Sequence, residues 1–400
     1  MLRRVAVFCL AAAVWAGMPQ DLAAKPKPAA MSPLPAGAIS AAPAGHMQFE
    51  PGMLLQYKRI RLPPFYRAKG WRILYMTRDF RKRPTLSTGL VILPDRAPRA
   101  PMDRKIVAWA HPTTGIARKC APSLRQSPTK AIDGLNQLVA AGLVVTATDY
   151  PGLGTEGPIG YLVGKGQAYA VIDSVRAARQ IPGVGGSNSY ALWGYSQGGH
   201  AVLFAADEAA SYAPDLKLQG AAAVAPPTDL GRLLNATIGS IEGRVLASMT
   251  LASWSQKYGT PLNAIVDSKV QRVIDQVNSY CVDDLGEKMD ILAAQKPLQQ
   301  KFLNFDPASR RPWSAMLFEN SRFSPTSRVP LYIAQGTSDD LVKAKVTLDY
   351  VRAACRQGVA VNYVALQNKG HGSSIDAAVP GAVNWLASRL NGGAIKSNCR

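Results

Sequence analysis

The chain has 400 residues, of which 47% are hydrophobic and 18% charged, as is typical of a globular protein with a large core. Its 46 Lys and Arg exceed its 26 Asp and Glu and give a net charge of +20. Such a surface can attract nucleic acid, anionic lipid or an acidic envelope polymer, but no nucleic-acid-binding motif accompanies the charge. We therefore interpret the excess as a solvated basic face and expect no nucleic-acid partner.

The first 48 residues predict a targeting segment and a leader. A basic start, MLRR, precedes an apolar run that is too short to span a bilayer. We predict a signal peptide over residues 1–24, with an uncleaved N-terminal anchor as the alternative. Residues 25–48 are rich in Pro and Ala and predict a disordered leader. The mature chain is then expected to be secreted or periplasmic.

From residue 49 the sequence predicts an α/β core. Residues 71–79 and 87–94 look like neighbouring antiparallel strands joined by a turn-prone stretch. Continuous apolar runs then alternate with helical segments, which is typical of a parallel sheet covered on both faces. The runs predicted to be strands are 105–110, 143–149, 190–194, 218–225, 329–336 and 359–366. The predicted helices are 166–181, 198–212, 343–357 and 375–390.

The alternation stops between residues 226 and 325. This segment has helical patches at 268–280 and 286–295 but no clear buried strand. Because it interrupts the alternating pattern, we expect a helical cap inserted into one core formed by 49–225 and 326–400. The alternative is an independent second domain.

The strand at 190–194 leads into G-Y-S-Q-G and then a helix. The G-x-S-x-G motif requires this strand–turn–helix context. The sharp turn needs Gly194 and Gly198, where a side chain would clash, and Ser196 would stand at the positive end of the following helix. The pattern predicts a nucleophilic serine, provided that a neighbouring base can accept its proton.

Chain order selects this base from only four histidines. In such a fold the nucleophile is followed by the acid and then by the histidine, so His46 and His111 come too early. His200 lies on the helix that begins beside the serine and points along it, which favours a structural role. His371 follows the strand at 359–366 on a Gly-rich loop, and we predict it as the base.

The acid should follow the preceding strand, where the sequence reads G-T-S-D-D-L-V. Such a turn presents its first aspartate inward, so Asp339 is the predicted acid and Asp340 the solvated alternative. The carboxylate would hold the imidazole tautomer and stabilise the imidazolium that forms during attack.

Acyl transfer also needs donors for the developing oxyanion, each worth about 3 kcal/mol. One should be the backbone N–H of Gln197, the residue after the nucleophile. The other should come from the loop H-P-T-T-G that follows the strand at 105–110. Because Pro112 has no N–H, we place this donor at Thr113.

Five motifs resemble, in order and spacing, those of the secretory lipases of the α/β-hydrolase superfamily, of which the yeast lipase A type is the best known. They read AWAHPTTGIARKCAPS, TDYPGLG, WGYSQGGHA, GTSDDLV and GHGSS. The resemblance implies a capped α/β-hydrolase fold that cleaves carboxylic esters, including acylglycerols, without a metal or organic cofactor. It puts the triad on Ser196, Asp339 and His371. Pro112 departs from the family pattern, which has glycine there.

Four cysteines remain once the signal peptide is removed, and by number alone they allow three pairings. No two lie close enough in the sequence to form a metal-binding knuckle. The family resemblance implies disulfides Cys120–Cys281 and Cys355–Cys399.

The hypothesis is therefore an exported serine ester hydrolase, a lipase or esterase, working through an acyl-enzyme. Its expected partner is a small-molecule or lipid ester, with transient contact to a lipid interface; no stable protein partner is inferred. Trp254, Trp313 and Phe318 are expected to form the acyl pocket or else the cap core. The alternatives are an envelope acyltransferase, an amide hydrolase, or a non-catalytic basic protein that binds the envelope.

Overall fold

The computed structural model describes residues 49–283, 285–294 and 302–399. The described residues all belong to one compact unit. The predicted signal peptide and leader, with His46, lie outside the described residues.

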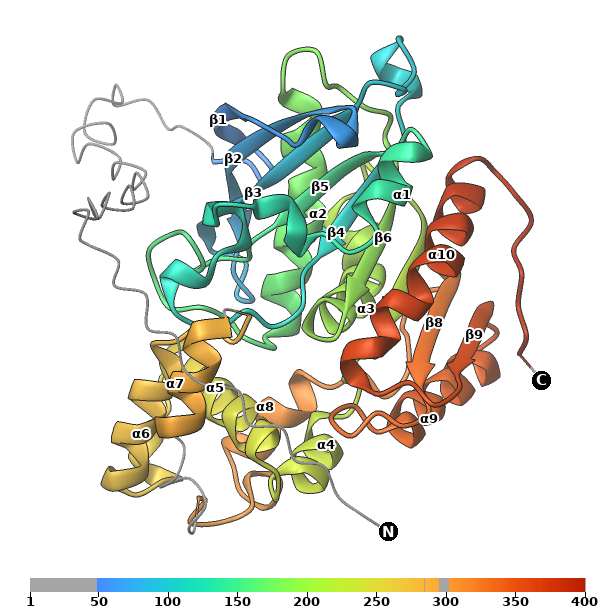
Figure 1. The fold of residues 1–400 in the computed structure, drawn as a ribbon. Coiled ribbons are helices and arrows are strands. Elements are labelled where there is room, and N and C mark those ends of the chain that lie inside the picture. The colour runs from blue at the N-terminus through green and yellow to red at the C-terminus, as the bar shows by residue number, and fades with distance from the viewer. Residues whose placement is uncertain (1–48, 284, 295–301, 400) are drawn as a thin grey trace, which may run out of the picture. The chain divides into compact units, whose positions relative to one another are not determined.

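A single nine-stranded sheet organises the described chain, in the order β1-β2-β3-β5-β4-β6-β7-β8-β9 (Figure 1). The strands are β1 (Leu54–Ile60), β2 (Ala68–Arg78), β3 (Pro84–Pro94), β4 (Ile106–Ala110), β5 (Val144–Thr148), β6 (Ser189–Tyr195), β7 (Lys217–Val224), β8 (Leu331–Gly336) and β9 (Val361–Leu366). The first three are antiparallel, β3 is also antiparallel to β5, and the remaining pairs are parallel. The parallel strands are mostly apolar because helices cover both faces; every residue of β4 and β5 is buried.

Helices pack against both faces of this sheet, with a different set on each face (Figure 1). The core helices are α1 (Leu135–Ala140), α2 (Gly164–Gln180), α3 (Gln197–Tyr212), α9 (Ala344–Arg356) and α10 (His371–Leu390). One hydrophobic cluster joins α2 and α3 to one face, and a second joins α1 and α10 to the other. This is the α/β-hydrolase fold, a mostly parallel sheet between two helical layers.

We call residues 226–325 the β7–β8 segment. Its helices are α4 (Leu230–Thr237), α5 (Ile241–Tyr258), α6 (Ser268–Asn278), α7 (Leu285–Ala294) and α8 (Trp313–Glu319), and its described part contains no strand. They gather beside one end of the sheet, at the lower left of Figure 1. A third hydrophobic cluster holds them together and also takes in Tyr161, Leu162 and Val163 from the loop between β5 and α2.

Several elements differ from the sequence-based expectations. Strand β1 was not predicted because its five central residues are all exposed, which leaves no burial pattern to find. The sequence pattern does not indicate helix α5, because this helix is buried on more than one side and shows no amphipathic stripe. Helix α10 begins at His371, four residues before the predicted start, so this histidine lies on the first turn of a helix and not on a loop.

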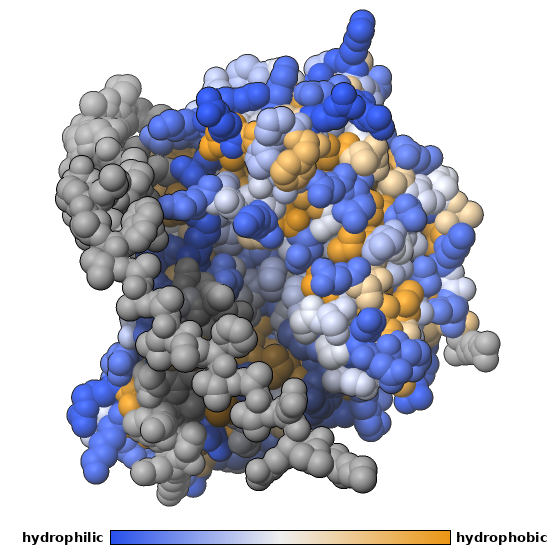
Figure 2. Space-filling view, viewed as in Figure 1, coloured by the Kyte–Doolittle hydropathy of each residue, from blue (hydrophilic) through white to orange (hydrophobic). Residues whose placement is uncertain are grey.

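Hydrophilic residues cover most of the face shown in Figure 2, with smaller hydrophobic patches between them. No helix of the described residues is long and apolar enough to cross a membrane.

Candidate active site

Ser196 occupies the sharp turn between β6 and α3, with φ 54° and ψ −118°. A non-glycine residue with positive φ is strained, and such strain persists only where the surroundings enforce it. Here the Ser196 N–H donates to the Val224 carbonyl at 2.9 Å. The turn also needs its flanking glycines, because a Cβ on Gly198 would overlap the Ala110 carbonyl oxygen and one on Gly194 would overlap the Gly198 carbonyl oxygen.

The structure brings Ser196, His371 and Asp339 together, although they are far apart in the sequence. His371 Nε2 lies 2.9 Å from Ser196 Oγ, and Nδ1 lies 2.8 Å from Asp339 Oδ2. A carboxylate can only accept, so Nδ1 carries the proton and Nε2 is left to accept from the serine hydroxyl. The main chain of His371 is held as well, because the Tyr195 hydroxyl donates to the His371 carbonyl at 2.9 Å.

Asp339 is fixed by four donors and has no exposed side-chain surface. Its Oδ1 accepts from the backbone N–H groups of Leu341 and Val342, at 2.9 and 2.8 Å. Its Oδ2 accepts from Gln335 Nε2 at 3.1 Å as well as from His371. The carboxylate therefore has a single orientation, aimed at the imidazole.

The other described histidines lie away from this arrangement. His200 Nε2 donates to the Asn320 carbonyl at 2.8 Å, and burial lowers the pKa of His200 to about 4. His111 is also buried, which lowers its pKa, and its Nδ1 lies 2.6 Å from the Pro112 carbonyl oxygen. Both rings stay neutral near pH 7 and contact backbone carbonyls, as structural histidines do.

Gln197 and Thr113, the residues predicted to supply the oxyanion donors, both border the cavity at Ser196. Gln197 is the first residue of α3, so its N–H belongs to the unpaired first turn of the helix. Thr113 lies on the loop after β4, and its Oγ1 is 3.0 Å from the hydroxyl of Tyr161. Tyr161 was not predicted as a site residue, and no motif around it could have indicated it.

A cavity of about 610 Å³ opens onto Ser196 and His371. Its walls are mainly apolar and come from α4, α5 and α8: Leu233, Leu246, Leu251, Trp254, Trp313 and Leu317. Trp254 and Trp313 thus line the cavity, as expected. Phe318 does not line the cavity and is 71% exposed.

Two disulfides join Cys120 to Cys281 and Cys355 to Cys399, the pairing that the family resemblance implied. The first connects the loop after β4 to the β7–β8 segment, and the second joins α9 to the C-terminal residues. Among the described residues, no group of three or more His, Cys, Asp or Glu side chains is placed to hold a metal ion.

The sheet order, the serine on its strained turn, and the acid and histidine that follow β8 and β9 define an α/β hydrolase. The chain belongs to the secretory lipase family, whose sequence model matches residues 131–398. Lipase A of Arthroderma benhamiae is 26% identical over 90% of this chain and 80% of its own length. A trichothecene C-3 esterase of Fusarium sporotrichioides is 24% identical over 86% and 81%.

One relative is described as a probable inactive lipase. This protein of Mycobacterium tuberculosis is 26% identical over 95% of the present chain and 87% of its own. Family membership and the lipase and esterase relatives support ester hydrolysis.

Solved structures show the same fold at low sequence identity. Lipase A of Candida antarctica aligns with a TM-score of 0.73 and 18% identity, over 88% of this chain and 84% of that one. A rice cell wall degrading esterase of Xanthomonas oryzae aligns with a TM-score of 0.70 and 19% identity, over 86% and 98%.

Proposed function

We propose that the protein is an exported serine hydrolase that cleaves carboxylic esters through an acyl-enzyme. The observation that carries this proposal is the hydrogen-bonded chain from Ser196 through His371 to Asp339 at the wall of an apolar cavity. A serine hydroxyl becomes a useful nucleophile only when a base is within hydrogen-bond reach, and 2.9 Å satisfies that condition.

In this proposal His371 Nε2 takes the proton from Ser196 Oγ as the oxygen attacks the ester carbonyl carbon. The backbone N–H groups of Gln197 and Thr113 donate to the oxyanion that forms. Asp339 keeps the proton on Nδ1 and stabilises the imidazolium. The C–O bond to the alcohol then breaks, and the alcohol leaves with the proton from Nε2. Water, deprotonated by His371 Nε2, then attacks the acyl carbon. The C–O bond to Ser196 Oγ breaks, Oγ takes the proton back from Nε2, and the acid is released.

We further propose that residues 226–325 are a cap over a core formed by 49–225 and 326–400, and that the cavity beneath it receives the acyl group. Ligand cavities of this size are usually apolar with a few polar groups, as here. An apolar acyl chain, as in acylglycerols, suits such walls better than a charged substrate.

Export is proposed from the expected signal peptide at 1–24 and leader at 25–48. The secretory family and the two disulfides support it, because disulfides persist in oxidising compartments.

The test is hydrolysis of p-nitrophenyl esters from acetyl to palmitoyl, and of a triglyceride emulsion, with Ser196→Ala as the matched control. We expect hydrolysis by the wild type and near-complete loss in Ser196→Ala. A folded wild type that hydrolyses no ester would contradict the proposal and favour the inactive state ascribed to one relative. Transfer of the acyl group to an added alcohol in preference to water would instead favour an acyltransferase.

A further inference from the structure

Tyr161 is attached to α5 through its main chain. Its N–H donates to Ser253 Oγ at 2.9 Å, and its carbonyl accepts from Trp254 Nε1 at 3.0 Å. Ser253 Oγ in turn donates to the Ile159 carbonyl at 2.7 Å. Two consecutive side chains of α5 thus hold both backbone groups of one loop residue, so the position of Tyr161 follows that of the helix.

The other end of Tyr161 reaches the proposed oxyanion loop, residues 111–115. Its hydroxyl lies 3.0 Å from Thr113 Oγ1, and the tyrosine is only 2% exposed. Either hydroxyl could donate, but a phenol is a better donor than an aliphatic alcohol, which favours Tyr161 as the donor and Thr113 as the acceptor. The hydroxyl hydrogen of Thr113 is then available to the cavity that Thr113 shares with Ser196.

The β7–β8 segment touches the same loop at a second place. The Val282 N–H donates to the Thr114 carbonyl at 3.0 Å, and a Cβ on Gly115 would lie only 2.9 Å from the Tyr280 carbonyl oxygen. The disulfide Cys120–Cys281 lies beside this contact.

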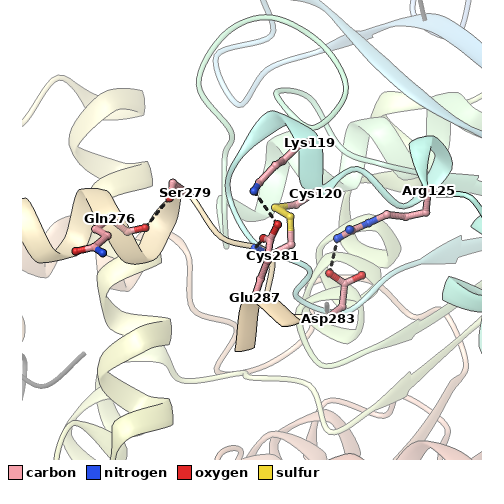
Figure 3. The surroundings of a disulfide bond; sticks show 8 residues. All are labelled: Lys119, Cys120, Arg125, Gln276, Ser279, Cys281, Asp283 and Glu287. Carbon is pink, nitrogen blue, oxygen red and sulfur yellow. Dashed lines mark hydrogen bonds and ion pairs between the residues drawn. A yellow bond between two sulfur atoms is a disulfide. The ribbon is translucent and has the colours of Figure 1, made fainter. Parts of the chain in front are cut away.

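Two ion pairs flank that disulfide (Figure 3). Lys119 reaches Glu287 at 2.8 Å, and Arg125 reaches Asp283 at 2.6 Å. Each pair joins the chain that follows the oxyanion loop to residues 283–287 of the β7–β8 segment. The loop therefore lies between two attachments, one through α5 and one through residues 280–287.

We infer that Tyr161 is a positioning residue that couples α5 to the oxyanion loop by orienting Thr113, an inference that rests on the proposed function. Seating of the cap on the core then places the Thr113 donor groups where charge develops on the ester oxygen. Without the Tyr161 hydroxyl, Thr113 retains its N–H and hydroxyl but loses its fixed orientation, which weakens binding of the transition state more than binding of the substrate.

The test compares five variants with the wild type. Tyr161→Phe removes the hydroxyl, and Tyr169→Phe is the matched control, since Tyr169 is equally buried and its hydroxyl bonds Glu208 on α3, outside the cavity. Thr113→Val removes the receiving hydroxyl, and the double variant Tyr161→Phe/Thr113→Val measures whether the two act through one another. Each is assayed for kcat and KM on p-nitrophenyl butanoate and for inhibition by butylboronic acid, which forms a tetrahedral adduct with a serine nucleophile.

We expect Tyr161→Phe to lower kcat and boronic acid affinity about tenfold, with KM changed less than about twofold, and Tyr169→Phe to behave as wild type. The double variant should be no worse than Thr113→Val alone, and Thr113→Ser, which keeps the hydroxyl, should retain most of the activity. If Tyr161→Phe has the same kcat and boronic acid affinity as Tyr169→Phe, or if the losses of the single variants multiply in the double variant, this inference is overturned. The proposed function still stands in that case, as long as the wild type hydrolyses the ester. A wild type without hydrolysis would overturn both.

Discussion

Asp339 and Asp340 are neighbours in the chain, yet their carboxylates lie in opposite surroundings. The Asp339 side chain has no exposed surface and lies 2.8 Å from His371 Nδ1, whereas the Asp340 side chain is 96% exposed and lies 3.2 Å from Lys343 Nζ. The backbone N–H groups of Leu341 and Val342 hold Asp339 in its inward position.

The two aspartates therefore form a natural pair of test and control. Asp339→Asn keeps the shape but can no longer stabilise the imidazolium or fix the reactive tautomer, so kcat should fall by about 10³–10⁴. Asp340→Asn should change kcat by less than about twofold, since an exposed ion pair contributes little. Ester hydrolysis by both purified variants measures this. Similar losses in both would mean that Asp339 has no special role.

The sequence alone was enough to predict which polar residues would meet in space. The glycine-flanked serine between a strand and a helix is a local signal that singles out Ser196. The scarcity of histidine and the chain order then leave His371 as the base. For the acid, the sequence leaves two neighbouring candidates, Asp339 and Asp340. The turn pattern selects Asp339, the residue that the structure places against His371.

The contacts between distant segments could not be predicted in this way. Tyr161 lies near Thr113 while Ser253 and Trp254 hold its backbone, and no motif encodes the packing of α5 against that loop. The helix start at His371 was missed for a different reason. Gly370 and Gly372 suggest a loop, whereas the Ser373 hydroxyl accepts from the Gly370 N–H and supports the first turn.

Gly198 should tolerate no larger residue. A methyl group there would overlap the Ala110 carbonyl oxygen of β4, and backbone on both sides prevents relaxation. We expect Gly198→Ala to lower the free energy of unfolding by about 3 kcal/mol or more. Gly239→Ala is the control, because nothing lies near its Cβ position. Thermal unfolding compares the two, and equal midpoints would contradict the steric explanation.

Asp133 should make stability depend on pH. Burial, with a further contribution from Asp376, raises the pKa of Asp133 to about 7, against about 3.9 in an unfolded chain. The folded protein thus holds the proton more tightly, so the free energy of unfolding falls as the pH rises from about 4 to 7, and the penalty is complete above pH 7.

Asp133→Asn mimics the protonated carboxyl and removes this penalty. It should stabilise the protein by about 2 kcal/mol more at pH 8.5 than at pH 5. Chemical denaturation at both pH values measures the difference, with Asp340→Asn as an exposed control that should show none. An equal effect of Asp133→Asn at the two values would mean that Asp133 is ionised in the folded protein at pH 5.

Leu246 should limit the length of the acyl chain. It lines the cavity on α5, eight residues before Trp254, whose indole donates to the Tyr161 carbonyl. Eight residues of helix correspond to about 12 Å, so Leu246 and Trp254 line parts of the cavity that lie well apart along α5.

Leu246→Trp should therefore lower kcat/KM for a palmitoyl ester about tenfold and leave that for a butanoyl ester nearly unchanged. Gln256→Trp places the same side chain at an exposed position of α5 outside this cavity and should leave the ratio of the two substrates unchanged. If Leu246→Trp lowers both substrates equally, the acyl chain does not run along α5.

Removal of the two disulfides should lower the free energy of unfolding by different amounts. Cys120–Cys281 joins residues 161 positions apart, and Cys355–Cys399 joins residues 44 apart, so the first restricts the unfolded chain more. Replacing either pair by serines should lower the free energy of unfolding by about 2 to 5 kcal/mol, with the larger loss at Cys120–Cys281. Guanidinium denaturation measures both losses.

The two disulfides should also differ in their effect on activity, because only Cys120–Cys281 lies beside the contact of Val282 with the oxyanion loop. In an assay without guanidinium, where both variants are folded, loss of Cys120–Cys281 should lower kcat. Loss of Cys355–Cys399 should leave kcat unchanged. Equal kcat values in the two variants would show that the loop keeps its place without that disulfide, leaving α5 and Tyr161 as its main support.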